Sequence, residues 1–160
     1  MNKRLLVMLF LMPGVMFPCL AQAYVGAGFG ITITDMEHSS SKIYAGLRLF
    51  PGLGIEIAYN DFGNYHGQRA DAYSLVAVAT VPVSNAWDLF VKLGATENHT
   101  SFAGTTRHSD LLTGFGFVYR QNSQVSLRFE YENFGRMLNN GSANNNNDVT
   151  NWGVSIVSLY

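Results

Sequence analysis

Val125-Ser-Leu-Arg-Phe-Glu-Tyr131 alternates apolar and polar residues, and this alternation decides the fold. Successive side chains of a β-strand point to opposite faces, so the two kinds of residue separate. The apolar face carries Val125, Leu127, Phe129 and Tyr131, and the polar face carries Ser126, Arg128 and Glu130. A soluble sheet would give these charges to water, whereas a membrane barrel would turn them inward and expose the apolar face to lipid.

The first 23 residues have the pattern of a secretory signal peptide. Lys3 and Arg4 are followed by an apolar run at 5–12, and Ala21-Gln-Ala23 supplies a cleavage site before Tyr24. The apolar run is shorter than a membrane-spanning helix needs. We therefore expect residues 1–23 to be cleaved and residues 24–160 to form one exported domain.

The single cysteine, Cys19, leaves a lipoprotein alternative open. Met16-Phe-Pro18 before it lacks the small residues that lipobox processing requires, so the alternative is disfavoured. Loss of residues 1–23 would remove two of the ten basic residues and none of the 11 acidic ones, leaving a formal charge of 8 − 11 = −3. No basic stripe indicates a nucleic-acid partner, and no motif indicates a cofactor.

Segments with a period of two recur along the whole exported part of the chain. They are 24–34, 42–50, 53–60, 70–81, 87–96, 111–120, 125–134 and 150–160. Segment 70–81 is apolar on both faces, so its register stays open. The pattern predicts an all-β fold, an eight-stranded antiparallel up-and-down transmembrane β-barrel.

The predicted connections alternate between short and long. The short ones, at 51–52, 82–86 and 121–124, contain turn-forming residues. The long ones are polar and cover 35–41, 61–69, 97–110 and 133–149. Outer-membrane barrels have short periplasmic turns and longer extracellular loops, so we expect a multi-pass barrel in the outer membrane of a Gram-negative bacterium, in contact with its lipid.

Aromatic residues near the strand ends are placed where two interfacial girdles would lie. They are Tyr24, Phe50, Tyr59, Trp87, Tyr119, Trp152 and Tyr160.

Charged residues sit opposite the apolar face of their strands. We expect them to form one lumen network of Arg48, Glu56, Lys92, Arg128, Glu130 and Glu132. Eight strands leave an interior filled by side chains, so a large open pore is not expected. The favoured role of the network is a structural plug, and the alternative is a narrow ion channel that these charges gate.

The chain resembles the OmpA-like, opacity-type family of small outer-membrane β-barrels. Tyr24-Val-Gly-Ala-Gly-Phe-Gly30, Trp87-Asp-Leu-Phe-Val-Lys-Leu-Gly94 and Gly114-Phe-Gly-Phe-Val-Tyr119, with residues 125–131, carry the resemblance. The resemblance implies a salt-bridge gate formed by Glu56, Lys92, Arg128 and Glu130. It also implies that the barrel-assembly machinery recognises the C-terminal strand, although Tyr160 and Ser155 stand where the family has Phe and Gly. The periplasmic peptidoglycan-binding domain of full-length OmpA is not expected after Tyr160.

Histidines cluster in the predicted long connections, where they are expected to be solvated and to form no metal site. They are His38, His66, His99 and His108. His99-Thr-Ser101 resembles part of the site of lipid A deacylases, but the next Glu is Glu130 and no third group is evident. A non-catalytic barrel is therefore expected, and a lipid A-modifying enzyme is the less favoured alternative.

The Asn-rich segment at 139–148 has the composition of a mobile extracellular loop. The favoured function is structural support of the envelope, with adhesion or contact with host molecules or phage through the loops. A soluble lipocalin-like barrel is the last alternative, and it would carry an apolar lumen and a charged exterior.

Overall fold

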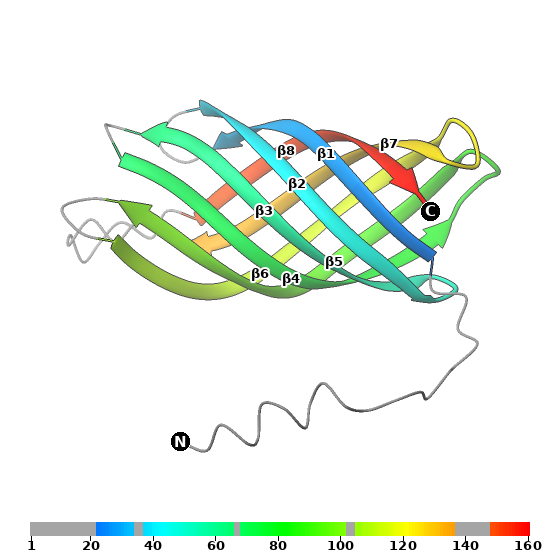
Figure 1. The fold of residues 1–160 in the computed structure, drawn as a ribbon, viewed down its shortest axis with the longest axis horizontal. Helices are drawn as coiled ribbons and strands as arrows, with labels where there is room; N and C mark the ends of the chain where they lie inside the picture. The colour runs from blue at the N-terminus through cyan, green and yellow to red at the C-terminus, as the bar shows by residue number, and fades with distance from the viewer. Residues whose placement is uncertain (1–21, 34–36, 66–67, 102–104, 137–147) are drawn as a thin grey trace, which may run out of the picture.

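The computed structural model describes residues 22–33, 37–65, 68–101, 105–136 and 148–160. Eight strands make up almost all of them. They are β1 (Gln22–Ile33), β2 (Glu37–Phe50), β3 (Leu53–Tyr65), β4 (Gln68–Pro82), β5 (Trp87–Ser101), β6 (Thr105–Arg120), β7 (Val125–Arg136) and β8 (Asp148–Leu159). Each strand pairs antiparallel with the next, and β8 pairs with β1 to close the barrel (Figure 1). The predicted fold class is confirmed.

The two faces of the sheet have reversed polarity compared with a soluble barrel. Large apolar side chains point outward, and Phe29 is 80% exposed while Ile57 is 60% exposed. In the middle of the barrel, charged side chains point into the lumen, where Glu56 and Lys92 are almost fully buried. A lipocalin-like barrel would show the opposite arrangement, so that alternative does not fit. The outer surface is suited to lipid as its solvent.

The barrel has a turn end and a loop end. The turn end carries the connections at 51–52, 83–86 and 121–124, and it lies at the right of Figure 1. β1 begins and β8 ends at this same end of the barrel. Gly52 has a φ of 81°, and its carbonyl accepts a hydrogen bond of 2.7 Å from Thr80 N, which fixes the tight β2–β3 turn. The connections at the loop end fall outside the described residues.

The predicted extent of the long connections is wrong, because the strands continue through most of them. β5 has 15 residues and β6 has 16, although a membrane-crossing strand needs roughly 9–11. Beyond the membrane both faces of a strand meet water, so the apolar alternation that marks a strand disappears. His38, His99 and His108 therefore lie on strands, and His66 lies outside the described residues.

The register of β4, which the sequence left open, follows from its burial pattern. Ser74, Val76 and Val78 are buried in the lumen, whereas Tyr73 and Leu75 are exposed on the outer face. Both faces of β4 are apolar because its inner face forms part of the packed lumen wall.

Of the seven predicted interfacial aromatics, five point outward: Tyr59, Trp87, Tyr119, Trp152 and Tyr160. Phe50 is exposed next to the β2–β3 turn. Trp87 packs on Tyr119 at the turn end, with ring centroids 4.9 Å apart. The prediction is wrong for Tyr24, which is 7% exposed and lies in the lumen, on the same face of β1 as its glycines. That the five others mark the membrane interfaces stays a prediction.

Helices long and apolar enough to cross a membrane are absent from the described part of the chain.

Candidate functional site: a charged network in the barrel lumen

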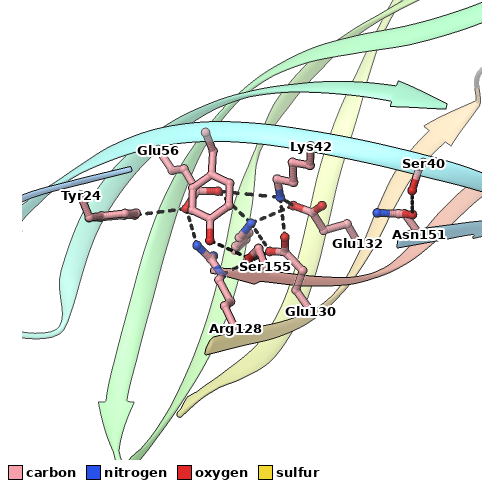
Figure 2. A network of polar contacts seen from close by, with 11 residues as sticks. Tyr24, Ser40, Lys42, Glu56, Arg128, Glu130, Glu132, Asn151 and Ser155 are labelled. Carbon is pink, nitrogen blue, oxygen red and sulfur yellow. Dashed lines mark hydrogen bonds and ion pairs between the residues drawn. The ribbon is translucent and has the colours of Figure 1, made fainter. Parts of the chain in front are cut away.

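Six charged side chains from four strands meet in the middle of the lumen (Figure 2). They are Lys42 from β2, Glu56 from β3, Lys92 from β5, and Arg128, Glu130 and Glu132 from β7. β7 supplies three of them because residues two apart on a strand share one face. Three cations and three carboxylates give the set a formal charge of zero.

Lys92 is the centre of this network. Its ammonium Nζ donates to Glu56 Oε1 at 2.9 Å, to Glu130 Oε2 at 2.6 Å and to Glu132 Oε1 at 2.8 Å. An ammonium group has three donors, so the hydrogen-bonding capacity of Lys92 is used completely.

Lys42 closes the network on the side of the loop end. Its Nζ donates to Glu130 Oε1 at 2.8 Å and to Glu132 Oε1 at 2.7 Å, and Glu56 Oε1 lies 4.0 Å away. Each of Glu130 and Glu132 is therefore shared by two lysines.

Arg128 closes the network on the side of the turn end. Its Nη1 donates to Glu56 Oε2 at 2.6 Å, and its Nε lies 3.3 Å from Glu130 Oε2. The guanidinium carbon lies 4.1 Å from the centroid of the Phe90 ring and 5.0 Å from that of Tyr44. These aromatic faces stabilise a cation that is removed from water.

Two tyrosines support the network from β1 and β2. The hydroxyl of Tyr24 donates to Glu56 Oε2 at 3.1 Å, and the hydroxyl of Tyr44 pairs with Ser155 Oγ at 2.8 Å. Each ring lies over a glycine of the neighbouring strand: a Cβ at Gly46 would come within 2.2 Å of the Tyr24 ring, and one at Gly26 within 2.2 Å of the Tyr44 ring. These glycines give the rings the room they need.

The structure brings together five of the six residues that the sequence grouped: Glu56, Lys92, Arg128, Glu130 and Glu132. It corrects the sixth, Arg48, which is exposed at the turn end and donates to Gln22 Oε1 at 3.2 Å. Arg48 shares the inward face of β2, but it lies too close to the turn to reach the network. Lys42 takes its place, and its even spacing from Tyr44 was the signal that could have identified it.

The lumen is also packed on the loop side of the network. Phe62 and Phe134 meet edge to face with centroids 5.0 Å apart, and Leu112 and Val149 are buried beside them. Asn98 Nδ2 donates to Phe134 O at 3.0 Å. We call Phe62, Leu112, Phe134 and Val149 the apolar layer. It lies between the network and the loop end.

His99 lies on the outer face of β5, away from the lumen. Its Nδ1 is 3.3 Å from Asp71 Oδ2 and its Nε2 is 3.3 Å from Glu97 Oε1. Carboxylates therefore face both ring nitrogens, a surrounding that the sequence did not reveal. The side chain of Ser101 lies outside the described residues. No three His, Cys, Asp or Glu side chains in the described ranges converge as a metal site.

Comparison with solved structures finds small outer-membrane barrels of the same shape. The chain is similar to Neisserial surface protein A (TM-score 0.62, 14% identity, 88% of this chain and 97% of that one). It is also similar to the N-terminal barrel domain of Pseudomonas aeruginosa OprF (TM-score 0.64, 11% identity, 86% of this chain and 97% of that one). A third similar structure is Ail, the attachment invasion locus protein of Yersinia pestis (TM-score 0.60, 14% identity, 88% of this chain and 99% of that one). At these identities the likeness shows the fold. Curated protein sequences give no match.

The sequence model of the OmpA-like transmembrane domain matches residues 21–158, which is nearly the whole barrel. The match agrees with the closed eight-stranded topology and with the outward apolar face. The chain therefore belongs to the OmpA-like transmembrane domain family and is an outer-membrane β-barrel.

Proposed function

We propose that the protein is a non-catalytic, plugged barrel that supports the outer membrane and presents its loop end for contact outside the cell. The observation that carries the proposal is the filling of the lumen by two successive obstacles, the charge network and the apolar layer. Eight-stranded barrels have narrow interiors that side chains can fill, so we expect this filling to leave no continuous aqueous path.

A narrow channel gated by the charge network is the second candidate. A cavity that opens at the turn end reaches Arg128, so within the described ranges the network and the apolar layer are what separates that end from the other. Among the described residues, the buried Oε2 of Glu132 and the side-chain amide of Asn60 have no hydrogen-bond partner, so both could form new pairs if the network rearranged.

Planar-bilayer recording separates the two candidates. We expect no conductance steps from the wild type or from Glu56→Ala, because the apolar layer stays closed when a charge is removed. Insertion of both proteins is checked by heat-modifiable gel mobility. Regular steps from the wild type would overturn the plug, and steps from Glu56→Ala alone would favour the gated channel.

The loop end is the part of the barrel suited to contact with other molecules. Two arginines with described, exposed side chains lie near carboxylates there: Arg69 Nη2 is 2.9 Å from Asp61 Oδ2, and Arg107 Nη1 is 4.0 Å from Glu97 Oε1. Ail was crystallised with the heparin analogue sucrose octasulfate. A polysulfated sugar needs unpaired cations, so these pairs favour a surface of mixed charge as the partner.

Adhesion of cells tests this contact. Cells that display the barrel are expected to adhere to an immobilised host matrix protein of mixed surface charge but not to immobilised heparin, and Arg69→Glu with Arg107→Glu should weaken adhesion to that protein. Binding to heparin that these two changes abolish would contradict the mixed-charge account. Equal adhesion by cells without the barrel would contradict a contact role altogether.

Catalysis on lipid A is tested at His99. We expect His99→Ala to leave the acylation pattern of lipid A unchanged, because both nitrogens of His99 face carboxylates rather than a described nucleophile. Mass spectrometry of lipid A from cells with the wild type, with the variant and without the barrel gives the answer. A lipid A species that appears with the wild type and disappears with the variant would show an enzyme.

Export and assembly complete the proposal. Residues 1–23 would direct export, and β8 with Tyr160 would present the C-terminal strand to the barrel-assembly machinery. Cleavage after Ala23 would remove Gln22 and Ala23 from β1, whose pairing with β2 begins at Gln22 and Arg48. The remaining pairs of β1 with β2 and β8 keep the barrel closed.

A further inference from the structure

The lumen holds a cavity of about 930 Å³ between the charge network and the turn end. Its volume falls within the roughly 300–1,000 Å³ of small-molecule sites. The wall is mostly apolar and includes Val78, Phe90, Val118, Val157 and Leu159. A plugged barrel does not need this space.

The shape of the cavity follows the strands. On β4 its lining steps inward from Pro82 through Thr80 to Val78. Pro82 and Val78 are four residues apart, and at ~3.3 Å per residue this gives a depth of about 13 Å along the strand. Arg128 and Tyr24 line the inner end of the cavity, and both are bonded to Glu56. The deep and mostly apolar wall suits an extended alkyl chain that enters from the turn end.

The mouth of the cavity carries an unbalanced positive charge. Arg120 Nη2 lies 3.1 Å from Asp88 Oδ1, so these two charges offset each other. Arg48 donates to the neutral amide of Gln22 and forms no ion pair with any residue that the structure describes. If residues 1–23 are cleaved as predicted, Arg48 also loses its hydrogen bond to Gln22.

We propose that this cavity binds a single-chain anionic amphiphile, with the alkyl chain against the apolar wall and the anionic head at the mouth beside Arg48. Burial of the chain removes apolar surface from water on both sides of the contact. The head keeps its hydration at the mouth and gains a charge-assisted hydrogen bond. A fatty acid and a lysophospholipid both have this chemistry.

Methyl NMR of the barrel tests the proposal directly. The protein is purified from outer membranes, transferred into phosphatidylcholine nanodiscs and titrated with dodecanoate. We expect saturable shifts of the methyl signals of Val78, Val118 and Val157, which line the cavity. The methyls of Val91 and Leu93 face lipid and report partitioning of dodecanoate into the bilayer.

Three further ligands separate head-group chemistry from the alkyl chain. Dodecyltrimethylammonium and dodecyl maltoside have the same chain without a negative charge, and we expect no saturable shifts from them at the same concentration. Lauroyl-lysophosphatidylglycerol is compared with dodecanoate, and the tighter of the two identifies the source of the amphiphile. Saturable binding of either one supports the proposal.

Variants locate the two parts of the site. Arg48→Glu should weaken dodecanoate binding about tenfold, the loss expected for one charge-assisted hydrogen bond. Arg107→Glu makes the same charge change at the loop end and should leave binding unchanged. Val118→Trp should fill the cavity and abolish binding, with heat-modifiable mobility showing that the barrel still folds.

Three results would each overturn the proposal. If dodecanoate shifted the cavity methyls no more than those of Val91 and Leu93, the cavity would not be a binding site. If Arg48→Glu bound as the wild type does, or if the cationic amphiphile bound as well as dodecanoate, there would be no anion recognition. Neither result bears on conductance or adhesion, so the proposed function stands or fails separately.

Discussion

Lys92→Met is expected to lower the free energy of unfolding of the barrel by about 3–5 kcal/mol, because it leaves buried carboxylates without their central partner. Glu56, Glu130 and Glu132 would then share Lys42 and Arg128, and the lumen would carry a formal charge of −1. Methionine keeps most of the side-chain volume, so the loss reports charge rather than packing. Urea unfolding in lipid vesicles, followed by tryptophan fluorescence, measures the change.

Arg107→Met is the matched control for this variant. It also removes one cation, but Arg107 is 70% exposed and its contact with Glu97 is 4.0 Å long. A surface pair contributes about 0–1 kcal/mol, so the control should be nearly neutral. In the double variant, adding Glu132→Gln removes one of the carboxylates that Lys92→Met leaves unpaired. It should therefore restore roughly 0.5–3 kcal/mol of the lost free energy of unfolding. Equal costs for Lys92→Met and Arg107→Met would show that the lumen charges are solvated and not a buried network.

Leu93→Arg is expected to cost about 2–4 kcal/mol of stability, because it places a charge on the lipid face near the middle of the membrane. Leu93 is 57% exposed. It pairs with Ala77 of β4 and Thr113 of β6, so it lies opposite the middle of both neighbouring strands. In a water-facing surface the same substitution would cost almost nothing. The same unfolding experiment in vesicles measures the cost.

Val83→Arg is the control that places the same charge at the edge of the membrane rather than in its middle. Val83 is 62% exposed but lies in the turn between β4 and β5, where an arginine side chain reaches water. A charge near the interface costs about 0–1 kcal/mol. The account requires Leu93→Arg to be the more harmful of the two variants, and similar effects would mean that the outer face does not meet lipid.

The central parts of the strands could be predicted from the sequence because one face meets lipid there and the other does not. Phe129 and Arg128 are neighbours in the chain with opposite surroundings, and their side chains record this difference. The ends of the strands could not be predicted, because residues such as His99 and Arg107 lie where both faces are wet. Hydrogen bonding between strands continues there without any apolar signal.

The sequence predicts which charged residues face the lumen, but it does not predict how far along the barrel axis each of them lies. Arg48 and Lys42 both share the inward face of β2, and alternation alone cannot decide between them. Their positions relative to the network depend on the tilt and stagger of the closed barrel, which are properties of the whole sheet. Tyr24 was misplaced for a related reason: it stands at a strand end, as interfacial aromatics do, but it shares the inward face of β1.

Two adjacent residues on β7 show most directly whether the barrel turns its apolar face to lipid and its polar face to the lumen. Ser126 lines the turn-end cavity inside the lumen, and Leu127 lies on the outer face. Each position is replaced by cysteine and spin-labelled, and the accessibility of the label to oxygen and to a water-soluble nickel complex is measured in lipid vesicles. We predict that the label at 127 is accessible to oxygen dissolved in lipid and shielded from nickel. The label at 126 should be accessible to nickel and less accessible to oxygen. Equal access of nickel to both labels, or greater access at 127, would contradict a barrel that turns its apolar face to lipid and its charges inward.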